Sequence, residues 1–369
     1  MKRFFYIKLF TTCFLYSLAL FTSHAEVKIV DKETKEPMDK ASVFDRNGKF
    51  IAVTDDNGVI PANISVSSYP LNIRYVGYMP QDITTPEAGV VELEETSYEL
   101  PEVTVDSESH NHLVLTAYVR NYITRATGRD TVVSFEEQIV DFMFPMTKKA
   151  KVKGWNKPRV LAQRTYDRGK NERKDTVRYT EGTKGYSYSY DLDDKFILPE
   201  AIAAGNAVKE IVPGKYGDKE IWQKRGDTYF VEKDVLADHK DHMVKPTLAK
   251  ILGLTMAMDQ SESKYKFTDS GKKQFSPEDV LEAVVSYHLN MSGKGIKYAF
   301  DTKDPIDFYG YGEMFVIDRA YLTAEEAKEL KKEKPVIDMS FKSPENIPLP
   351  PPEMLKIKER VLQENPNAK

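Results

Sequence analysis

The sequence predicts a mainly β or α+β protein, in which an N-terminal β-sandwich precedes a larger α+β domain with an antiparallel sheet. Residues 26–106 contain short alternating apolar segments separated by turn residues, which is the pattern of a sandwich. Residues 107–335 mix longer strand-like and helix-like patterns, and residues 336–369 combine a proline-rich segment with a short helix. The 369 residues leave room for two domains of ~100–200 residues each.

The composition excludes several classes of protein. Hydrophobic residues make up 41% and charged residues 30% of the chain, a mixture unlike that of disordered or membrane-spanning chains. The net charge of −4 provides no basic field, so we expect no nucleic acid partner. Cys13 is the single cysteine, which excludes intramolecular disulfides, zinc ribbons and cysteine-ligated iron–sulfur clusters.

Residues 1–25 have the features of a Sec-type signal peptide. Three basic residues precede the apolar run from Leu9 to Phe21, and small residues end at Ala25, where a signal peptidase would cut. The run is shorter than the ~20 residues of a spanning helix, although a membrane anchor and a buried helix are the alternatives. Cleavage would remove Cys13 and three of the 53 basic residues, leaving 50 against 57 acidic ones. We therefore expect an exported, cysteine-free chain, periplasmic or associated with the outer membrane.

The sandwich elements follow one another closely. Val27 and Ile29 begin a first strand, and Asn47-Gly48 is the signature of a tight hairpin between two further strands. Residues 55–58 form a second turn, and the alternation over residues 71–76 predicts another strand. Five to seven strands in about 80 residues indicate a sandwich rather than a helical domain.

Several short motifs in this region carry a resemblance to a known family. They are Val30-Asp31, Glu36-Pro37, Ala41-Ser42-Val43, Thr54-Asp55-Asp56-Asn57-Gly58 and Ile73-Arg74-Tyr75-Val76-Gly77-Tyr78. In this order they resemble the carboxypeptidase regulatory-like domain, a transthyretin-like sandwich, in the version common in envelope proteins of Bacteroidota. Residues 100–105 are similar to the segment that leads into a TonB-dependent plug and barrel, but nothing resembling a plug follows. The resemblance implies an envelope location and a folding or docking module.

The second region begins after a polar linker at residues 107–111. Apolar residues from Leu115 to Ala126 recur at helical spacing and Gly128 ends the pattern, which predicts an amphipathic helix packed on a sheet. Residues 131–144 and 159–166 are rich in β-branched and aromatic residues and predict strands.

Capping signals predict the later helices. Ser276 followed by Pro277 is typical of a helix start, and Thr323 with Glu326 forms a capping box before a helix that ends near Lys332. Strands are expected at residues 296–300 and 313–321. Taken with the other expected strands and helices, they indicate an α+β domain whose sheet is predominantly antiparallel.

The tail changes character. Its prolines favour an extended polyproline II segment, and Met354, Ile357 and Val361 recur at the spacing of a short helix. We interpret the segment as a strap docked on the domain surface, with a peptide offered to a partner as the alternative.

A search for catalytic chemistry leaves one metal candidate. Neither His-x-x-Glu nor His-Glu-x-x-His occurs, so no catalytic or cofactor-binding residue is assigned despite the peptidase name of the resemblance. Asp238, His239 and His242 could face one ion on a helix, but a zinc site needs a third protein ligand. A solvated charged helix face is the plainer interpretation of these residues.

An aromatic stripe is the second candidate site. Tyr186, Tyr188 and Tyr190 alternate with serines and would share one strand face. With Trp222 they could form a stacking platform for a sugar, although aromatics on a half-buried sheet are more often core.

These observations favour a non-enzymatic exported envelope protein that uses its sandwich for folding, docking or ligand binding. Its partner would be an envelope protein or a glycan or lipid ligand, and peripheral association with the outer membrane stays open. The alternative is a carrier of an apolar, lipid-like ligand, which would need a continuous apolar cavity of ~300 Å³ or more inside the sheet. A metal-dependent hydrolase comes third and requires His239 and His242 to converge with a further ligand.

Overall fold

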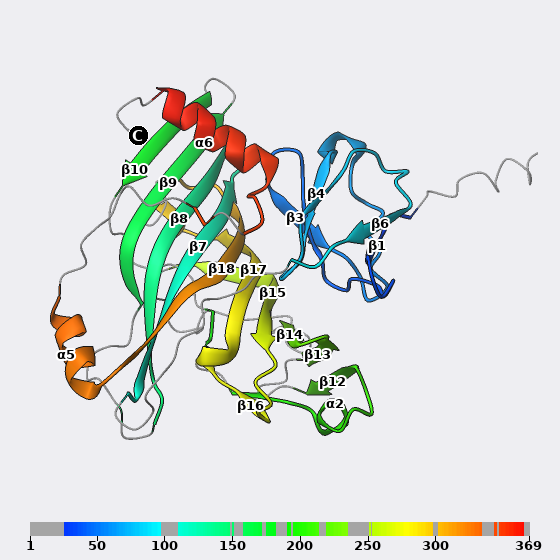
Figure 1. The fold of residues 1–369 in the computed structure, drawn as a ribbon. Helices are drawn as coiled ribbons and strands as arrows, with labels where there is room; N and C mark the ends of the chain where they lie inside the picture. The colour runs from blue at the N-terminus through cyan, green and yellow to red at the C-terminus, as the bar shows by residue number, and fades with distance from the viewer. Residues whose placement is uncertain are drawn as a thin grey trace, which may run out of the picture.

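The computed structural model describes most of the chain, and the protein is mainly β with one large antiparallel sheet (Figure 1). The described residues are 26–96, 110–147, 150, 158–171, 175–181, 190–192, 195–213, 219–234, 251, 253–297, 302–333, 343–344 and 347–364. The expected signal peptide at residues 1–25 lies outside them.

The N-terminal part, which we call the sandwich, contains two small sheets. Strand β1 (Lys28–Asp31) pairs in parallel with β6 (Val90–Leu93). The second sheet has the order β3-β2-β4-β5, and its strands are β2 (Ser42–Phe44), β3 (Phe50–Val53), β4 (Leu71–Arg74) and β5 (Gln81–Ile83). A 3-10 turn, η1 (Val66–Ser68), precedes β4. The two predicted turns are present, because Gly48 and Gly58 both adopt φ of 74°, a conformation that favours glycine.

The large sheet has ten antiparallel strands in the order β10-β9-β8-β7-β18-β17-β15-β14-β13-β12. Its strands are β7 (His112–Ala126), β8 (Asp130–Pro145), β9 (Arg159–Asn171), β10 (Asp175–Glu181), β12 (Lys209–Pro213), β13 (Lys219–Arg225), β14 (Thr228–Asp234), β15 (Thr255–Thr268), β17 (Val280–Ser292) and β18 (Ile306–Leu322). The last strand, β18, lies between β17 and β7, so it joins two runs of neighbouring strands into one sheet.

The remaining elements are short. Strands β11 (Phe196–Ile197) and β16 (Gln274–Phe275) pair with each other, and helix α2 (Glu200–Ala203) follows β11. Helix α5 (Ala324–Lys332) follows β18, and helix α6 (Pro352–Glu364) lies across β8, β9 and β10 (Figure 1). In the part of the chain that the structure describes, no helix combines the length and the apolar character needed to cross a bilayer.

The two faces of the large sheet pack against different partners. We call the face that carries Tyr122, Phe135 and Tyr311 the first face; it shares one apolar cluster with the sandwich core and with the buried side of α6. The second face carries Leu115, Val140 and Met314 and packs against apolar side chains from outside the sheet, namely Tyr190, Leu192, Phe196, Ile202 and Phe275 of β16. Because side chains alternate along a strand, each long strand contributes to both clusters.

The predicted helix at residues 115–126 is wrong, because this segment is the central strand β7. Its neighbours β8 and β18 are paired along its whole length, and both of its faces are buried. A strand buried on both faces loses the two-residue alternation, and the spacing of the remaining apolar residues then imitates a helix.

Two other local predictions also need correction. The cap at Ser276 starts only a 3-10 turn, η2 (Pro277–Asp279), before the chain enters β17. Residues 296–297 have helical backbone instead of the predicted strand, because the turn at Gly293 places Ile296 in a small apolar cluster. The rest of that predicted strand, residues 298–300, lies outside the described residues. The predicted strands over residues 131–144, 159–166 and 313–321 are confirmed, as are α5 and α6.

Candidate functional site

The predicted metal ligands cannot be placed. Asp238, His239 and His242 lie outside the described residues, as do Tyr186 and Tyr188 of the aromatic stripe. Within the described ranges no group of three or more histidine, cysteine, aspartate or glutamate side chains could hold a metal ion.

The two described aromatic candidates are buried. Trp222, in β13, has no exposed surface, and its ring centroid lies 6.0 Å from that of Phe275. Tyr190 is 2% exposed and belongs to the same apolar cluster on the second face. Neither ring offers the open face that stacking on a sugar requires, so both are core residues in this structure.

A buried ion triad joins the sandwich to the large sheet. Glu313 of β18 lies between Arg74 of β4 and Arg120 of β7, with nitrogen–oxygen distances of 2.8 Å to each guanidinium. Tyr122 donates a further hydrogen bond to the same carboxylate at 2.7 Å. Burial raises the pKa of Glu313, but the guanidiniums of Arg120 and Arg74 outweigh it and hold the pKa below its usual value. Glu313 is therefore a buried carboxylate that stays charged.

The same two arginines hold the C-terminal segment. Arg120 donates to the carbonyl of Pro348 at 2.6 Å, and Arg74 donates to the carbonyl of Leu349 at 2.8 Å. Consecutive carbonyls of one segment are thus bound by one arginine from the sheet and one from the sandwich. At Pro348 and Leu349 the C-terminal segment, which we call the strap, therefore lies in the junction between the two parts.

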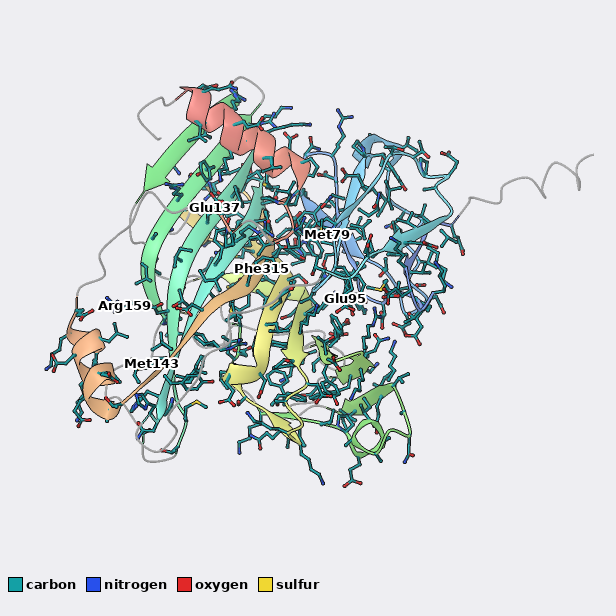
Figure 2. All side chains as sticks on the ribbon, in the orientation of Figure 1. Met79, Glu95, Glu137, Met143, Arg159 and Phe315 are labelled. Atoms are coloured by element: carbon teal, nitrogen blue, oxygen red, sulfur yellow. The ribbon has the colours of Figure 1, made fainter. Side chains whose placement is uncertain are left out.

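Helix α6 is fixed by a second buried carboxylate. Glu137 of β8 is 1% exposed and accepts from Lys358 of α6 at 2.8 Å. Tyr118 and Ser343 donate to it at 2.6 and 2.9 Å. Burial raises the pKa of Glu137, and the Lys358 ammonium outweighs that effect and lowers it. Glu137 is labelled beneath α6 in Figure 2.

Further polar contacts attach the sandwich along its contact with the sheet. They join Asp31 to Arg225 at 2.6 Å, the backbone N–H of Gly77 to Glu282 at 2.8 Å, and Glu95 to Lys266 at 2.9 Å. Figure 2 shows side chains filling the junction, with Glu95 labelled there. The sandwich is therefore attached to the large sheet by several separate polar contacts as well as by the ion triad.

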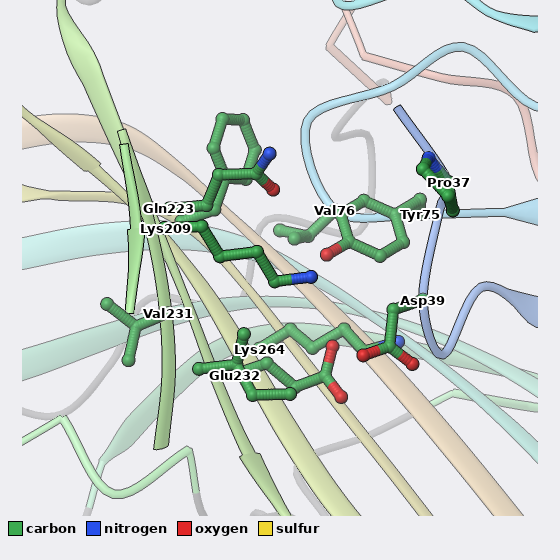
Figure 3. A pocket seen from close by; sticks show the side chains of 11 residues that line it. Pro37, Asp39, Tyr75, Val76, Lys209, Gln223, Val231, Glu232 and Lys264 are labelled. Atoms are coloured by element: carbon green, nitrogen blue, oxygen red, sulfur yellow. The ribbon is translucent and has the colours of Figure 1, made fainter. Parts of the chain in front are cut away.

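One junction pocket gathers carboxylates (Figure 3). Asp39 of the sandwich faces Glu232 and Lys264 of the sheet, and the space between the lining side chains is about 10 Å³, about enough for one water molecule. Burial raises the pKa of Glu232 to about 8, while Lys264 opposes the shift and Glu262 adds to it. Burial also raises the pKa of Asp39 and Glu262. The carboxyl groups around this pocket therefore keep their protons to a higher pH than exposed carboxyl groups do. The pocket itself is too small for an organic ligand.

A larger pocket opens at one end of the sheet, and we call it the sheet-end pocket. Its volume is about 380 Å³, within the ~300–1,000 Å³ of typical ligand pockets. It is lined by the turn after β7 and by the ends of β15, β17 and β18, namely by Ala126, Thr127, Gly128, Thr255, Ala257, Asn290, Met291, Ser292, Pro305, Ile306 and Asp307. It is the larger of these two pockets and the one that could admit a small organic molecule.

Charged and aromatic groups surround Asp307 at the margin of this pocket. His288 Nε2 lies 2.5 Å from one oxygen of Asp307, and Lys49 of the sandwich lies 3.6 Å from the other. The ring of Tyr309 stacks on His288 at 3.9 Å, and the Lys49 ammonium lies 4.0 Å from the centroid of the same ring. Each oxygen of the Asp307 carboxylate therefore has a neighbouring side-chain nitrogen, and the Tyr309 ring contacts both His288 and Lys49.

Sequence reasoning missed this pocket because strand pairing creates it. Asn290 pairs with Asp307, and Thr255 pairs with Ser292, across gaps in the sequence that no local pattern reveals. The alternation within β17 does place His288, Asn290 and Ser292 on one face, which is the signal that was available.

Comparisons with known proteins do not assign a family. No family model and no curated protein matches the chain. Among solved structures, it is similar to a chain described under lipid–protein interactions in lipovitellin, with 8% identity, a TM-score of 0.27, and coverage of 58% of this chain and 26% of that one. A putative AttH protein from Nitrosomonas europaea matches with 7% identity, a TM-score of 0.16, and coverage of 60% and 57%. The chain thus spans about a quarter of the lipovitellin chain.

Proposed function

We propose that this chain is an exported, non-enzymatic binding protein of the bacterial envelope, in which the large sheet carries the binding site and the sandwich is a fixed structural module. The observation that carries the proposal is the sheet-end pocket, which is open and of ligand size.

The buried junction supports the structural role of the sandwich. Arg74 is 2% exposed and is occupied by Glu313 and Leu349, so this part of the sandwich is not available to recruit another protein. A docking module on a flexible linker would keep such groups at its surface. The sandwich instead holds the sheet in place and leaves the end of the sheet accessible.

The packing of the sheet favours a binding protein over the alternative, a carrier of an apolar ligand. Large side chains on the second face, among them Trp222, Tyr265 and Phe267, are fully buried against one another and their neighbours. A lipid carrier needs a continuous apolar cavity there, whereas the sheet-end pocket includes hydroxyl, amide and carboxylate groups.

Photo-crosslinking in the native envelope tests the proposal. A photoreactive amino acid at Ala257, in the pocket, is compared with one at Ala62, an exposed turn of the sandwich. A discrete adduct formed only from position 257 supports the proposal. The same abundant bystanders at both positions, or stoichiometric lipid in an organic extract of the purified protein, would contradict it.

A further inference from the structure

We infer that the sheet-end pocket binds a neutral saccharide of about one or two rings, an inference that rests on the proposed binding function. Four strands bring the recognition groups together on the first face. Ala257, Asn290, Asp307 and Ala126 lie on one rung across β15, β17, β18 and β7. The paired residues Thr255 and Ser292 lie two residues further along β15 and β17, on the same face as Ala257 and Asn290.

Three side chains of the pocket are available for hydrogen bonds. The hydroxyls of Thr255 and Ser292 and the amide of Asn290 make no side-chain hydrogen bond to the described part of the chain. Thr127 differs, because its hydroxyl accepts from the backbone N–H of Asp130 at 3.0 Å within the turn. Hydroxyl and amide groups both donate and accept, which is what the hydroxyls of a sugar require.

The charges of the lining exclude strongly charged ligands. The lining contains no lysine or arginine, so no cation in the pocket would bind a phosphate or a carboxylate. Asp307 is its single acid, and His288 and Lys49 already contact its two oxygens. A neutral ligand is therefore favoured over an anion or an amine.

The apolar part of the lining completes the match. Ala126, Ala257 and Pro305 provide aliphatic surface beside the polar groups. The faces of a sugar ring carry C–H groups while its edge carries hydroxyls, so a saccharide can use both kinds of surface. The volume of about 380 Å³ accommodates a ligand of this size.

Saturation-transfer NMR on the chain from residue 26 to residue 369 tests the inference. The probes are glucose, galactose, N-acetylglucosamine, maltose, lactose and chitobiose, with laurate as the apolar comparison. We expect at least one sugar to bind, and we expect Ala257→Trp, which fills the pocket, to weaken that binding at least tenfold. Asn290→Leu, an exposed position that should leave the fold intact, is expected to weaken it about threefold or more. The matched control Asn63→Leu, in an exposed turn of the sandwich, should leave binding unchanged.

The outcomes separate this inference from the proposed function. Failure of every sugar, or sugar binding that survives both pocket substitutions, overturns the inference. Laurate bound in place of sugars overturns it too and favours the carrier. If the sugars fail while crosslinking at position 257 still yields a discrete adduct, the binding function stands and only the ligand class is wrong.

Discussion

At the scale of single residues, the junction depends on side chains that are buried and still ionised. Glu313 is 4% exposed and forms ion pairs with the guanidiniums of Arg74 and Arg120. The same arginines donate hydrogen bonds to two consecutive backbone carbonyls of the strap. A buried ion pair adds little net stability by itself, because desolvation opposes the attraction. Removing one member is different, since it leaves the other charges buried without a partner.

The variant Glu313→Gln should therefore be strongly destabilised. The neutral side chain leaves Arg74 and Arg120 without a counter-charge, and we expect the free energy of unfolding to fall by about 3–5 kcal/mol. Urea denaturation followed by far-UV circular dichroism measures the loss. The control Glu94→Gln removes an exposed ion pair with Lys32 and should leave the urea midpoint unchanged. Similar midpoints for the two variants would show that the triad is not important for stability.

The carboxylates of the junction pocket predict a dependence of stability on pH. The pKa of Glu232 is about 8 in the folded protein, above its ordinary value of 4.5, so the folded state holds a proton that the unfolded state releases. The free energy of unfolding should thus fall as the pH rises from about 4.5 to about 8, by up to about 1.4 kcal/mol per pH unit for this group.

Urea denaturation between pH 5 and pH 8 measures this slope. Glu232→Gln mimics the protonated side chain and should flatten the curve, because the titrating group is gone. Glu92→Gln, which removes an exposed carboxylate on β6, is the control and should keep the wild-type slope. Equal slopes for Glu232→Gln and the wild type would mean that other groups carry the pH dependence.

At the scale of elements, local signals predicted some segments and failed at others for a physical reason. The capping box at Thr323 predicted α5 correctly, because the hydrogen bonds that define it lie within four residues. The same kind of signal at Ser276 produced only a 3-10 turn, since pairing with β15 and β18 determines the conformation from Val280 onward. Tertiary pairing also turned the apparent helix at residues 115–126 into β7.

Helix α6 shows how an element is stabilised by its contacts with distant residues. Met354, Ile357 and Val361 are buried, and they join the cluster formed by the sandwich and the first face of the sheet. Met354 packs so closely on Gly48 of the first hairpin that a Cβ there would lie 2.9 Å from its terminal methyl. Isolated helices of this length are marginal in water, so this docking stabilises the helix.

We expect Ile357→Ala to lower the free energy of unfolding by about 2–4 kcal/mol, because Ile357 is 2% exposed and the substitution leaves a cavity under α6. Thermal and urea denaturation both report the change. Lys356→Ala, one residue away on the exposed side, is the matched control and should change stability by less than about 0.5 kcal/mol. Comparable losses for the two substitutions would contradict the prediction, because they would show that burial of Ile357 is not what stabilises α6.

At the scale of the whole molecule, the site was less predictable than the fold. The fold class follows from strand-like segments, each of which the sequence displays locally. The sheet-end pocket depends on which strands pair and in what register, and β18 pairs with β7 although almost 200 residues separate them in the sequence. The residue types of the pocket, such as Thr255, Ala257 and Asn290, are also ordinary surface residues that no motif distinguishes.

The junction also predicts that the sandwich and the large sheet unfold together. Buried polar contacts from Arg74, Asp31, Gly77 and Glu95 join them, and one apolar cluster spans both parts. Losing either part would expose that cluster and leave the buried charges of the other part unpaired, so neither should persist alone. We therefore expect one cooperative transition in urea, whichever part of the molecule is observed.

Two local reporters measure this cooperativity. Neither tryptophan of the chain lies in residues 26–96, so tryptophan fluorescence reports on the region beyond the sandwich. A dye on Ser67→Cys, at an exposed position in η1 of a chain that lacks Cys13 once residues 1–25 are removed, reports on the sandwich. Both signals should change at the same urea concentration, and Glu313→Gln should shift both midpoints together. A dye transition well below the tryptophan transition would instead mean two independent domains, with the sandwich free to act as a docking module.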